Sequence, residues 1–146
     1  MLLIDTIVQP SGIHGLGCFT TESIRRGQTI WVYDRRLDLS ITESEVLKLP
    51  KPTQSFLYCY CYVVLERRRR HLILCGDNSR YMNHSDSPNT ADNIACRDIE
   101  SGEELTCDYA SFDLDAHAKI LGNSLTGTTA CSPGSDSKRR WWKIFS

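Results

Sequence analysis

Two polar segments set between apolar runs constrain this chain more than any other feature. Residues 80–89 read Arg-Tyr-Met-Asn-His-Ser-Asp-Ser-Pro-Asn, with apolar runs before and after them. Further along, Gly102-Glu-Glu-Leu-Thr-Cys-Asp-Tyr109 ends a strand-like run. Flanking strands draw such segments inside the protein, where polar groups need hydrogen-bond partners or a ligand. Together the segments predict a ligand-lined cleft with a tyrosine hydroxyl at its base.

Size and charge limit the kind of protein. The 146 residues fit one domain, and 40% apolar residues allow a modest core. Residues 1–113 carry 12 Lys and Arg against 16 Asp and Glu, whereas residues 114–146 carry 5 against 2. A mildly acidic body suits a basic peptide better than nucleic acid, so we expect no direct nucleic-acid contact. There is no long apolar run and no basic leader, so neither a membrane span nor a secretory signal is expected.

The cysteines indicate a reducing, intracellular setting. There are seven, an odd number, and most lie in apolar strand-like runs, which is typical of buried thiols. Cys59 and Cys61 form a Cys-x-Cys pair, but on a strand they would share one face, and no second pair completes four zinc ligands. We therefore expect no metal site.

The periodicity predicts a β-rich domain. Strands are expected at residues 1–9 and 29–33, and alternation over 56–65 predicts a strand whose one face is tyrosine-rich. With the apolar run 71–74 it would form a hairpin about Glu66-Arg-Arg-Arg-Arg70. This tip is either a solvated turn or a contact for an acidic partner.

Two helices, a loop and a repeated corner complete the pattern. Residues 42–50 predict a helix that begins with a capping box, Thr42 and Glu45, and ends at Pro50. A short helix is expected at 114–121, followed by a flexible linker at 122–137 and a basic, aromatic tail at 138–146. Gly12, Gly15 and Gly17 mark a loop that either turns or contacts a ligand. The phrase Ile-x-x-Gly-x-x-(Ile/Leu) occurs at Ile24 and at Ile99 and predicts two equivalent turn–strand corners.

Read in order, these motifs resemble the SET-domain lysine methyltransferases. The resemblance rests on Gly15-Leu-Gly17, on residues 76–85 with Pro88-Asn89, and on Gly102–Tyr109, and it covers about residues 6–113. It implies a mainly β fold (the β-clip, or SET, fold): small curled sheets around a C-terminal pseudoknot, with one or two short helices. Residues 80–85 and 105–109 would thread together. Residues 1–113 would form the SET domain, without a preceding pre-SET region, and residues 114–146 a C-terminal extension.

The resemblance also implies a cofactor and its site. S-adenosylmethionine, with S-adenosylhomocysteine as product, would lie against one set of residues: Ile13, His14, Gly15, Leu16, Gly17, Arg80, Tyr81, Asn83 and His84. Tyr109 would be the catalytic residue. The substrate lysine would enter a channel lined by Tyr58, Tyr60, Cys107 and Tyr109. His84 and Asn83 would hold the cofactor rather than transfer protons, and the small Cys107 would leave room for multiple methylation.

The chain departs from many members of this family behind the catalytic tyrosine. Asp86 stands where a zinc-binding Cys is common, and only Cys131 lies downstream of Tyr109, so no post-SET zinc is expected. The Trp141-Trp142 tail, or a second subunit in a homodimer, would then close the lysine channel.

The implied function is protein-lysine N-methylation of a histone or another basic protein. The location would be intracellular: cytoplasmic for a bacterial protein, nuclear for one acting on host chromatin. Two alternatives stay open. One is a non-catalytic SET-like module that binds a peptide or the cofactor, and the other is a nucleic-acid binder that uses Arg67–Arg70 and the tail.

Overall fold

The computed structural model describes residues 1–125, which form two compact units. Unit 1 combines Met1–Leu39 with Leu74–Tyr109, and unit 2 combines Ser40–Ile73 with the segment that begins at Ala110. The predicted tail, with Trp141 and Trp142, lies outside the described residues. The predicted domain boundary between residues 113 and 114 stays a prediction. Each unit is discontinuous in sequence and is described by itself.

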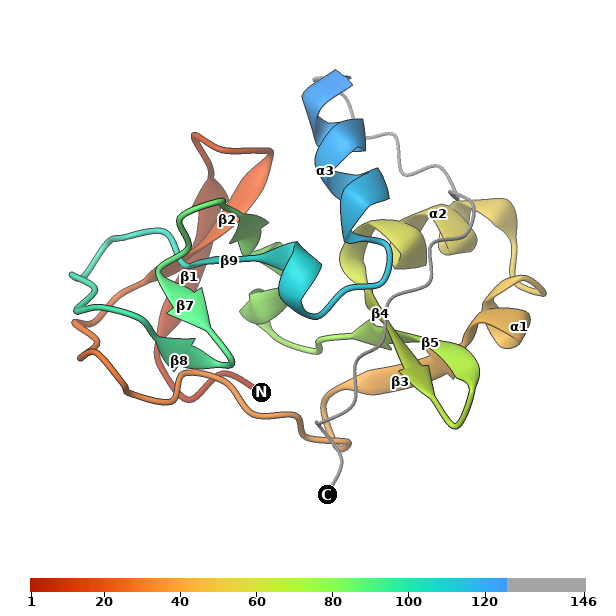
Figure 1. Cartoon of the computed structure of the whole chain (residues 1–146), viewed down its shortest axis with the longest axis horizontal. Coiled ribbons are helices and arrows are strands. Elements are labelled where there is room, and N and C mark those ends of the chain that lie inside the picture. Colours follow the sequence, from red (N-terminus) through yellow and green to blue (C-terminus); the bar gives the residue numbers. More distant parts are fainter. Residues whose placement is uncertain (126–146) are drawn as a thin grey trace. The chain divides into compact units, whose positions relative to one another are not determined.

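Unit 1 is built from three pairs of short strands (Figure 1). The pairs are β1 (Thr6–Pro10) with β2 (Leu16–Thr20), β7 (Thr90–Ala91) with β8 (Ile94–Ala95), and β6 (Asn83–His84) with β9 (Thr106–Cys107). The first two pairs are antiparallel and the third is parallel. Two 3-10 helices, η1 (Asn78–Tyr81) and η2 (Tyr109–Ser111), precede β6 and follow β9. Parallel pairing of β6 with β9 confirms that the two polar segments run side by side.

The turns of the two repeated corners are equivalent, as the sequence predicts, but only the second corner leads into a strand, β9. Ile24 and Ile99 form an antiparallel bridge, and their backbones exchange hydrogen bonds of 2.8 and 2.9 Å. The glycine of each corner has positive φ, +82° at Gly27 and +89° at Gly102, which a side chain would disfavour. The predicted strand 29–33 is wrong, because only isolated bridges form there, at Thr29 and Trp31.

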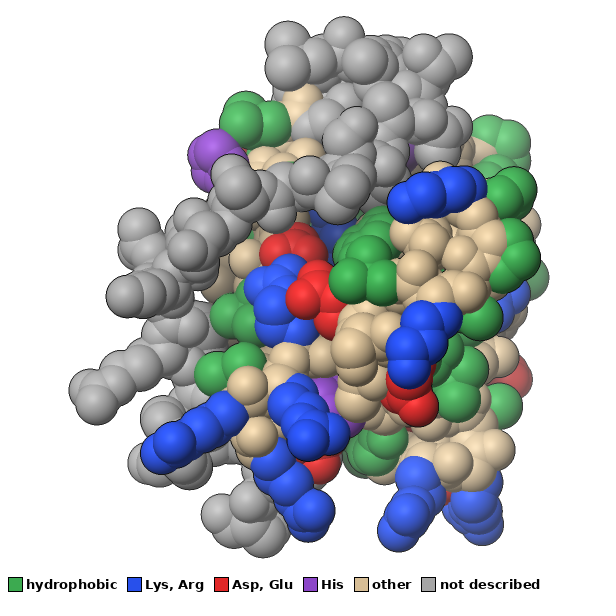
Figure 2. All heavy atoms as spheres, turned by 90° about the vertical axis from the view of Figure 1, so that its right-hand side faces the viewer, with side chains coloured by type: hydrophobic (Ala, Val, Ile, Leu, Met, Phe, Trp, Pro, Cys, Tyr) green, Lys and Arg blue, Asp and Glu red, His purple; other side chains and the backbone are tan. Residues whose placement is uncertain are grey.

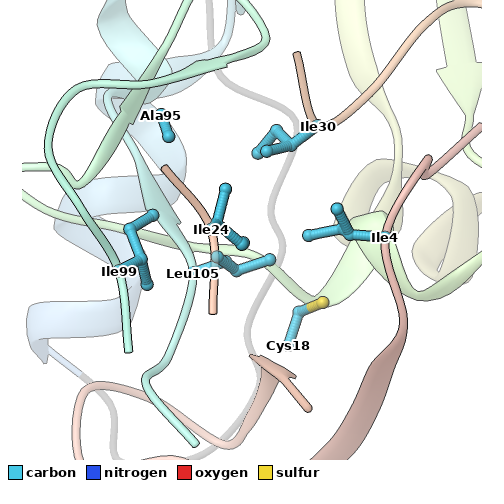
Figure 3. Close-up of a cluster of buried hydrophobic side chains, with 7 residues drawn as sticks. All are labelled: Ile4, Cys18, Ile24, Ile30, Ala95, Ile99 and Leu105. Atoms are coloured by element: carbon cyan, nitrogen blue, oxygen red, sulfur yellow. The ribbon is translucent and has the colours of Figure 1, made fainter. Parts of the chain in front are cut away.

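One apolar cluster holds unit 1 together. Its buried members come from both corners and from several strands (Figure 3): Ile4, Cys18, Ile24, Ile30, Ala95, Ile99 and Leu105. Leu105 is fully buried and immediately precedes β9, while Cys18 is fully buried in β2. Burial raises the pKa of the Cys18 thiol to about 12. Within this cluster the N–H of Leu105 donates to the carbonyl of Cys18 at 2.7 Å, which joins the segment before β9 to β2.

Unit 2 contains a three-stranded sheet and three helices (Figure 1). The strand order is β3 (Leu39–Thr42), β5 (Arg69–Leu74) and β4 (Tyr62–Glu66), and the helices are α1 (Glu43–Val46), α2 (Lys51–Tyr60) and α3 (Ala116–Leu125). The capping box of Thr42 and Glu45 forms as predicted, although α1 is one turn long. None of the helices in the described part of the chain is long and apolar enough to cross a membrane.

The predicted tyrosine-faced strand over 56–65 is wrong in its first half, which is helix α2. Pro50 is the N-cap and Pro52 occupies the first turn, a common helix start. Gln54 and Leu57 are buried and lie three residues apart, which is a helical period. The amide of Gln54 donates to the carbonyls of Leu47 and Leu49, at 3.1 and 2.7 Å, so it also satisfies the end of the preceding turn.

Consequently, Cys59 lies within α2 and Cys61 caps it, so they do not share a strand face. Among the described cysteines, Cys18, Cys61 and Cys75 are buried as expected, whereas Cys96 is exposed.

Candidate functional site

The hydroxyl of Tyr109 lies beside a backbone carbonyl at the junction of the two polar segments. Tyr109 follows β9 and starts η2, and β9 pairs in parallel with β6. The hydroxyl donates a 2.8 Å hydrogen bond to the carbonyl of Met82, the residue before Asn83. Because the proton is directed at Met82, the oxygen lone pairs point away from that carbonyl. The hydroxyl oxygen of Tyr109 and the carbonyl oxygen of Met82 are thus held next to each other in unit 1.

His84 orients the backbone of Tyr109. Its Nδ1 accepts a 3.3 Å hydrogen bond from the Tyr109 N–H, and the two rings lie 5.4 Å apart. Its Nε2 lies 3.3 Å from Oδ1 of the fully exposed Asp86. Its Nδ1 also lies 3.6 Å from Oδ1 of Asp108. His84 therefore holds the backbone of Tyr109, and its role towards the cofactor stays a prediction.

Asn83 fastens the predicted glycine loop. The residue is buried, with 6% of its surface exposed. Its Nδ2 donates to the carbonyls of His14 and Leu16, at 3.1 Å each, and to Oε1 of Glu104 at 2.7 Å. The structure therefore brings the glycine loop together with the segment of Asn83 and His84, as the predicted cofactor site requires.

The outer surface of this loop is open and apolar. Ile13 is 52% exposed and Leu16 is 46% exposed. Gly15 has a φ of +49°, and a Cβ at this position would have no atom within 4 Å. These apolar side chains are therefore accessible to a ligand at the loop.

Arg80 and Tyr81 lie in η1, directly before the Met82–Asn83 step. The Arg80 guanidinium stacks over the Tyr81 ring at 5.0 Å from its centroid, a cation–π contact. The preceding Asp77 caps η1 by accepting from the Ser79 N–H at 3.0 Å. Burial alone would raise the pKa of Asp77, but hydrogen bonds from Ser79 and from the Leu2 backbone outweigh it and lower the pKa.

The predicted channel residues are divided between the units. Cys107 and Tyr109 belong to unit 1, at β9 and η2. Tyr58 and Tyr60 belong to unit 2, on α2 rather than on the predicted strand. Burial, and secondly the charge of Glu43, raises the pKa of Tyr58. A shared lysine channel stays a prediction.

Sequence reasoning missed two polar residues that organise the site. Glu104 accepts from Asn83 and from the hydroxyl of Ser11, 2.8 Å from each carboxylate oxygen. Asn89 is 5% exposed; its side chain donates to the Glu104 carbonyl at 2.8 Å and accepts from the Thr106 N–H at 2.8 Å. In the sequence, Asn89 is recognisable only as part of the Pro88-Asn89 motif. For both, the available signal was a polar side chain placed close to a buried strand.

The arginines of the β4–β5 hairpin are not equivalent. Arg70 binds two carboxylates, Glu43 at 3.0 Å and Asp115 at 2.7 Å. Arg67, Arg68 and Arg69 are exposed at the tip. On this face of the molecule, Lys and Arg side chains stand in separate groups among acidic and uncharged residues (Figure 2).

Within the described residues, no group of three or more His, Cys, Asp or Glu side chains is arranged to hold a metal ion.

Comparison with known proteins gives related sequences and folds. A putative histone-lysine N-methyltransferase 1 of Plasmodium falciparum is 30% identical over 141 residues, which include 85% of this chain. The chain spans only 2% of that curated relative.

Two solved structures share the fold. One is the Polycomb Repressive Complex 2 of Chaetomium thermophilum, autoinhibited and bound to S-adenosylmethionine: the TM-score is 0.59 and the identity 21%, over 81% of this chain and 16% of that one. The other is a putative histone methyltransferase of Plasmodium falciparum: the TM-score is 0.51 and the identity 20%, over 74% of this chain and 95% of that one.

These likenesses confirm the expected mainly β fold of small sheets, although the described residues contain three α-helices where one or two were expected. The family model of the SET domain matches residues 15–110, about two thirds of the chain. The matched region includes the glycine loop from Gly15, the Asn83-His84 pair and Tyr109. This chain belongs to the SET domain family.

Proposed function

We propose that this chain is a protein-lysine N-methyltransferase that uses S-adenosylmethionine. The observation that carries the proposal is the hydroxyl of Tyr109 held 2.8 Å from the Met82 carbonyl, next to the buried Asn83 that fastens the glycine loop. Membership of the SET family supports it, as does a solved structure of the same fold that is bound to S-adenosylmethionine.

The residues of unit 1 fit this cofactor. Ile13 and Leu16 present apolar surface, and the loop offers its backbone between them. Within the described residues, Oδ1 of Asn83 makes no hydrogen bond, because all the bonds of this side chain use Nδ2. The oxygen is therefore able to accept from a ligand. When bound, S-adenosylmethionine supplies an electrophilic methyl group on a positively charged sulfur.

The reaction requires a neutral lysine amine. A pH of 7 lies about 3.4 units below the ordinary lysine pKa of about 10.4. Deprotonating the amine at this pH therefore costs roughly 4.6 kcal/mol. A site of low polarity favours the neutral form.

Tyr109 then has a geometric task. Its hydroxyl proton is directed at the Met82 carbonyl, and its oxygen is oriented to accept from an amine N–H or from an electron-poor C–H. Alignment of the reacting groups supplies much of the acceleration, since well-oriented reactants gain about 7–11 kcal/mol. His84 keeps Tyr109 in place through the backbone.

The proposed substrate is a lysine side chain of a histone or another basic protein inside a cell. The mildly acidic region 1–113 favours a basic partner. The small side chain of Cys107 near Tyr109 supports the addition of more than one methyl group. We also propose a homodimer, which light scattering would test.

The test is methylation of core histones and of a mixed protein extract with labelled S-adenosylmethionine, by the wild-type chain and by Tyr109→Phe. We expect labelled lysine with the wild type and a loss of about 100-fold or more with the variant, because alignment is lost. Calorimetry with S-adenosylhomocysteine should show equal binding by both. Cofactor binding without any labelling would favour a non-catalytic module, and undiminished labelling by Tyr109→Phe would contradict the role of the tyrosine.

A further inference from the structure

Glu104 joins the segment of Tyr109 to the glycine loop. Its Oε1 accepts from Nδ2 of Asn83 at 2.7 Å, and both its oxygens lie 2.8 Å from the hydroxyl of Ser11. The Glu104 backbone forms a bridge with Phe19 of β2. We refer to Glu104, Ser11, Asn83 and Gly17 as the Glu104 cluster.

Ser11 connects Glu104 to the backbone of the glycine loop. Its hydroxyl oxygen accepts from the N–H groups of Ile13 and His14, at 2.8 and 3.4 Å. Its own N–H donates to the carbonyl of Gly15 at 2.9 Å. Asn83 holds the other side of the loop through the carbonyls of His14 and Leu16. Residues 11–16 are thus fixed by two side chains that both end on one carboxylate.

Gly17 allows the carboxylate to come this close. A Cβ at position 17 would lie 2.3 Å from Oε1 and 2.7 Å from Cδ of Glu104. The φ of Gly17 is not in the left-handed region, so the glycine here serves to leave space for the Glu104 carboxylate, which an added side chain would displace.

The carboxylate of Glu104 is not used in an ion pair within the described residues, where its side-chain donors, Ser11 and Asn83, are neutral. Hydrogen bonds to an ionised acceptor are stronger than bonds between neutral groups. A half-buried charge without a cationic partner lowers the stability of the fold. The position of the Glu104 carboxylate is therefore better explained by its contacts with the glycine loop than by a contribution to stability.

We propose that Glu104 is a positioning residue that fixes the glycine loop for cofactor binding, acting through Ser11 and Asn83. The inference rests on the proposed function, because it takes residues 13–17 as the cofactor surface. It assigns to Glu104 control of affinity for the adenosyl cofactor and no contact with the reacting atoms.

The test compares Glu104→Gln and Glu104→Ala with Glu103→Gln. Glu103 is the matched control: it is the adjacent glutamate, but its carboxylate binds Arg97 at 2.6 Å and the Glu100 N–H, away from the loop. Binding of S-adenosylhomocysteine is measured by calorimetry, and thermal unfolding confirms that each variant is folded.

We expect about tenfold weaker binding for Glu104→Gln, the change associated with one charge-assisted hydrogen bond, and a larger loss for Glu104→Ala. Glu103→Gln should bind like the wild type. In methylation assays the KM for S-adenosylmethionine should rise, while kcat at saturating cofactor and the KM for the protein substrate stay nearly constant. A structural defect alone would not produce this split.

A double-mutant cycle with Ser11→Ala separates the proposed route from a general effect. If Glu104 acts through Ser11, removing the second residue costs much less affinity when the first is already changed. Equal binding by wild type, Glu104→Gln and Glu104→Ala would overturn the inference. Failure of the wild type itself to bind S-adenosylhomocysteine would instead overturn the proposed function.

Discussion

Gly17 shows how much of this site depends on a single missing side chain. The position lies in β2 and is buried against Glu104 and the ring of Phe19, which a Cβ would approach to 2.9 Å. Gly12, five residues earlier, has no atom within 4 Å of a Cβ and an ordinary φ. The two glycines therefore have different roles. Gly17 permits the close approach of the Glu104 carboxylate, whereas no atom approaches Gly12 closely.

Gly17→Ala should displace Glu104 and weaken both the fold and cofactor binding. Overpacking of this kind costs about 1–3 kcal/mol. We expect urea unfolding to show such a loss and calorimetry to show weaker binding of S-adenosylhomocysteine. Gly12→Ala is the matched control and should unfold at the same urea concentration as the wild type or slightly above it. Equal behaviour of the two variants would contradict the close approach.

At the scale of single residues, the sequence predicts the motif residues but not the side chain that holds them in place, Glu104. Tyr109, Asn83 and His84 stand in a recognisable order, so their importance is readable. The role of Glu104 depends on the distance between β2 and the segment before β9, which no local pattern encodes. Two consecutive glutamates, Glu103 and Glu104, have different tasks that only the three-dimensional structure separates.

At the scale of elements, two hairpin turns have the same backbone but different residues. In unit 2, Arg67 and Arg68 connect β4 to β5 with φ of +47° and +65°. In unit 1, Asp92 and Asn93 connect β7 to β8 with φ of +48° and +66°. Such two-residue turns favour Asn, Asp and Gly, because other side chains clash in the left-handed region.

Replacing Arg67-Arg68 with Asn-Gly should therefore stabilise the chain. The left-handed conformation costs an ordinary residue roughly 1–2 kcal/mol, so a gain of about 1 kcal/mol is expected in urea unfolding. The reciprocal control, Asp92→Arg with Asn93→Arg, places arginines in the other turn and should destabilise it. A loss of stability in the Asn-Gly variant would show that the arginines make contacts which outweigh their strain.

Helix α2 shows why the elements were only partly predictable. Three tyrosines at alternate positions, 58, 60 and 62, suggest a strand, but only Tyr62 lies in one. The rings of Phe56 and Tyr60 pair at 5.1 Å across one helical turn, and the prolines at 50 and 52 start the helix. Burial of Gln54 and Leu57 decided the outcome over the alternation of tyrosines.

At the scale of the whole molecule, the chain enters unit 1, passes into unit 2, and repeats this order once. Such an arrangement arises from pairings between residues distant in sequence, such as Asn83 with Thr106 and Ile24 with Ile99. A sequence shows the apolar runs that form the strands but not which runs meet. The parallel β6–β9 pair was predictable only because the motifs resemble those of a known family.

The stability of the whole chain should depend on pH through two buried thiols. Burial raises the pKa of Cys18 to about 12 and that of Cys75 to about 11. In the unfolded chain a thiol has a pKa of about 8.5, so only the unfolded state releases these protons just above that pH. The contribution to stability is therefore fully present below about pH 8.5, and is lost as pH rises toward the folded pKa values.

Urea unfolding at several pH values between 7 and 10.5 tests this expectation. Each thiol should remove up to about 1.4 kcal/mol of unfolding free energy per pH unit above about pH 8.5. Cys18→Ala and Cys75→Ala should each lower stability at pH 7, since both sites are buried, yet make the alkaline decline shallower. Cys96 is exposed, so Cys96→Ala should leave the slope unchanged. An alkaline slope that is the same in all three variants would assign the decline to groups other than the buried thiols.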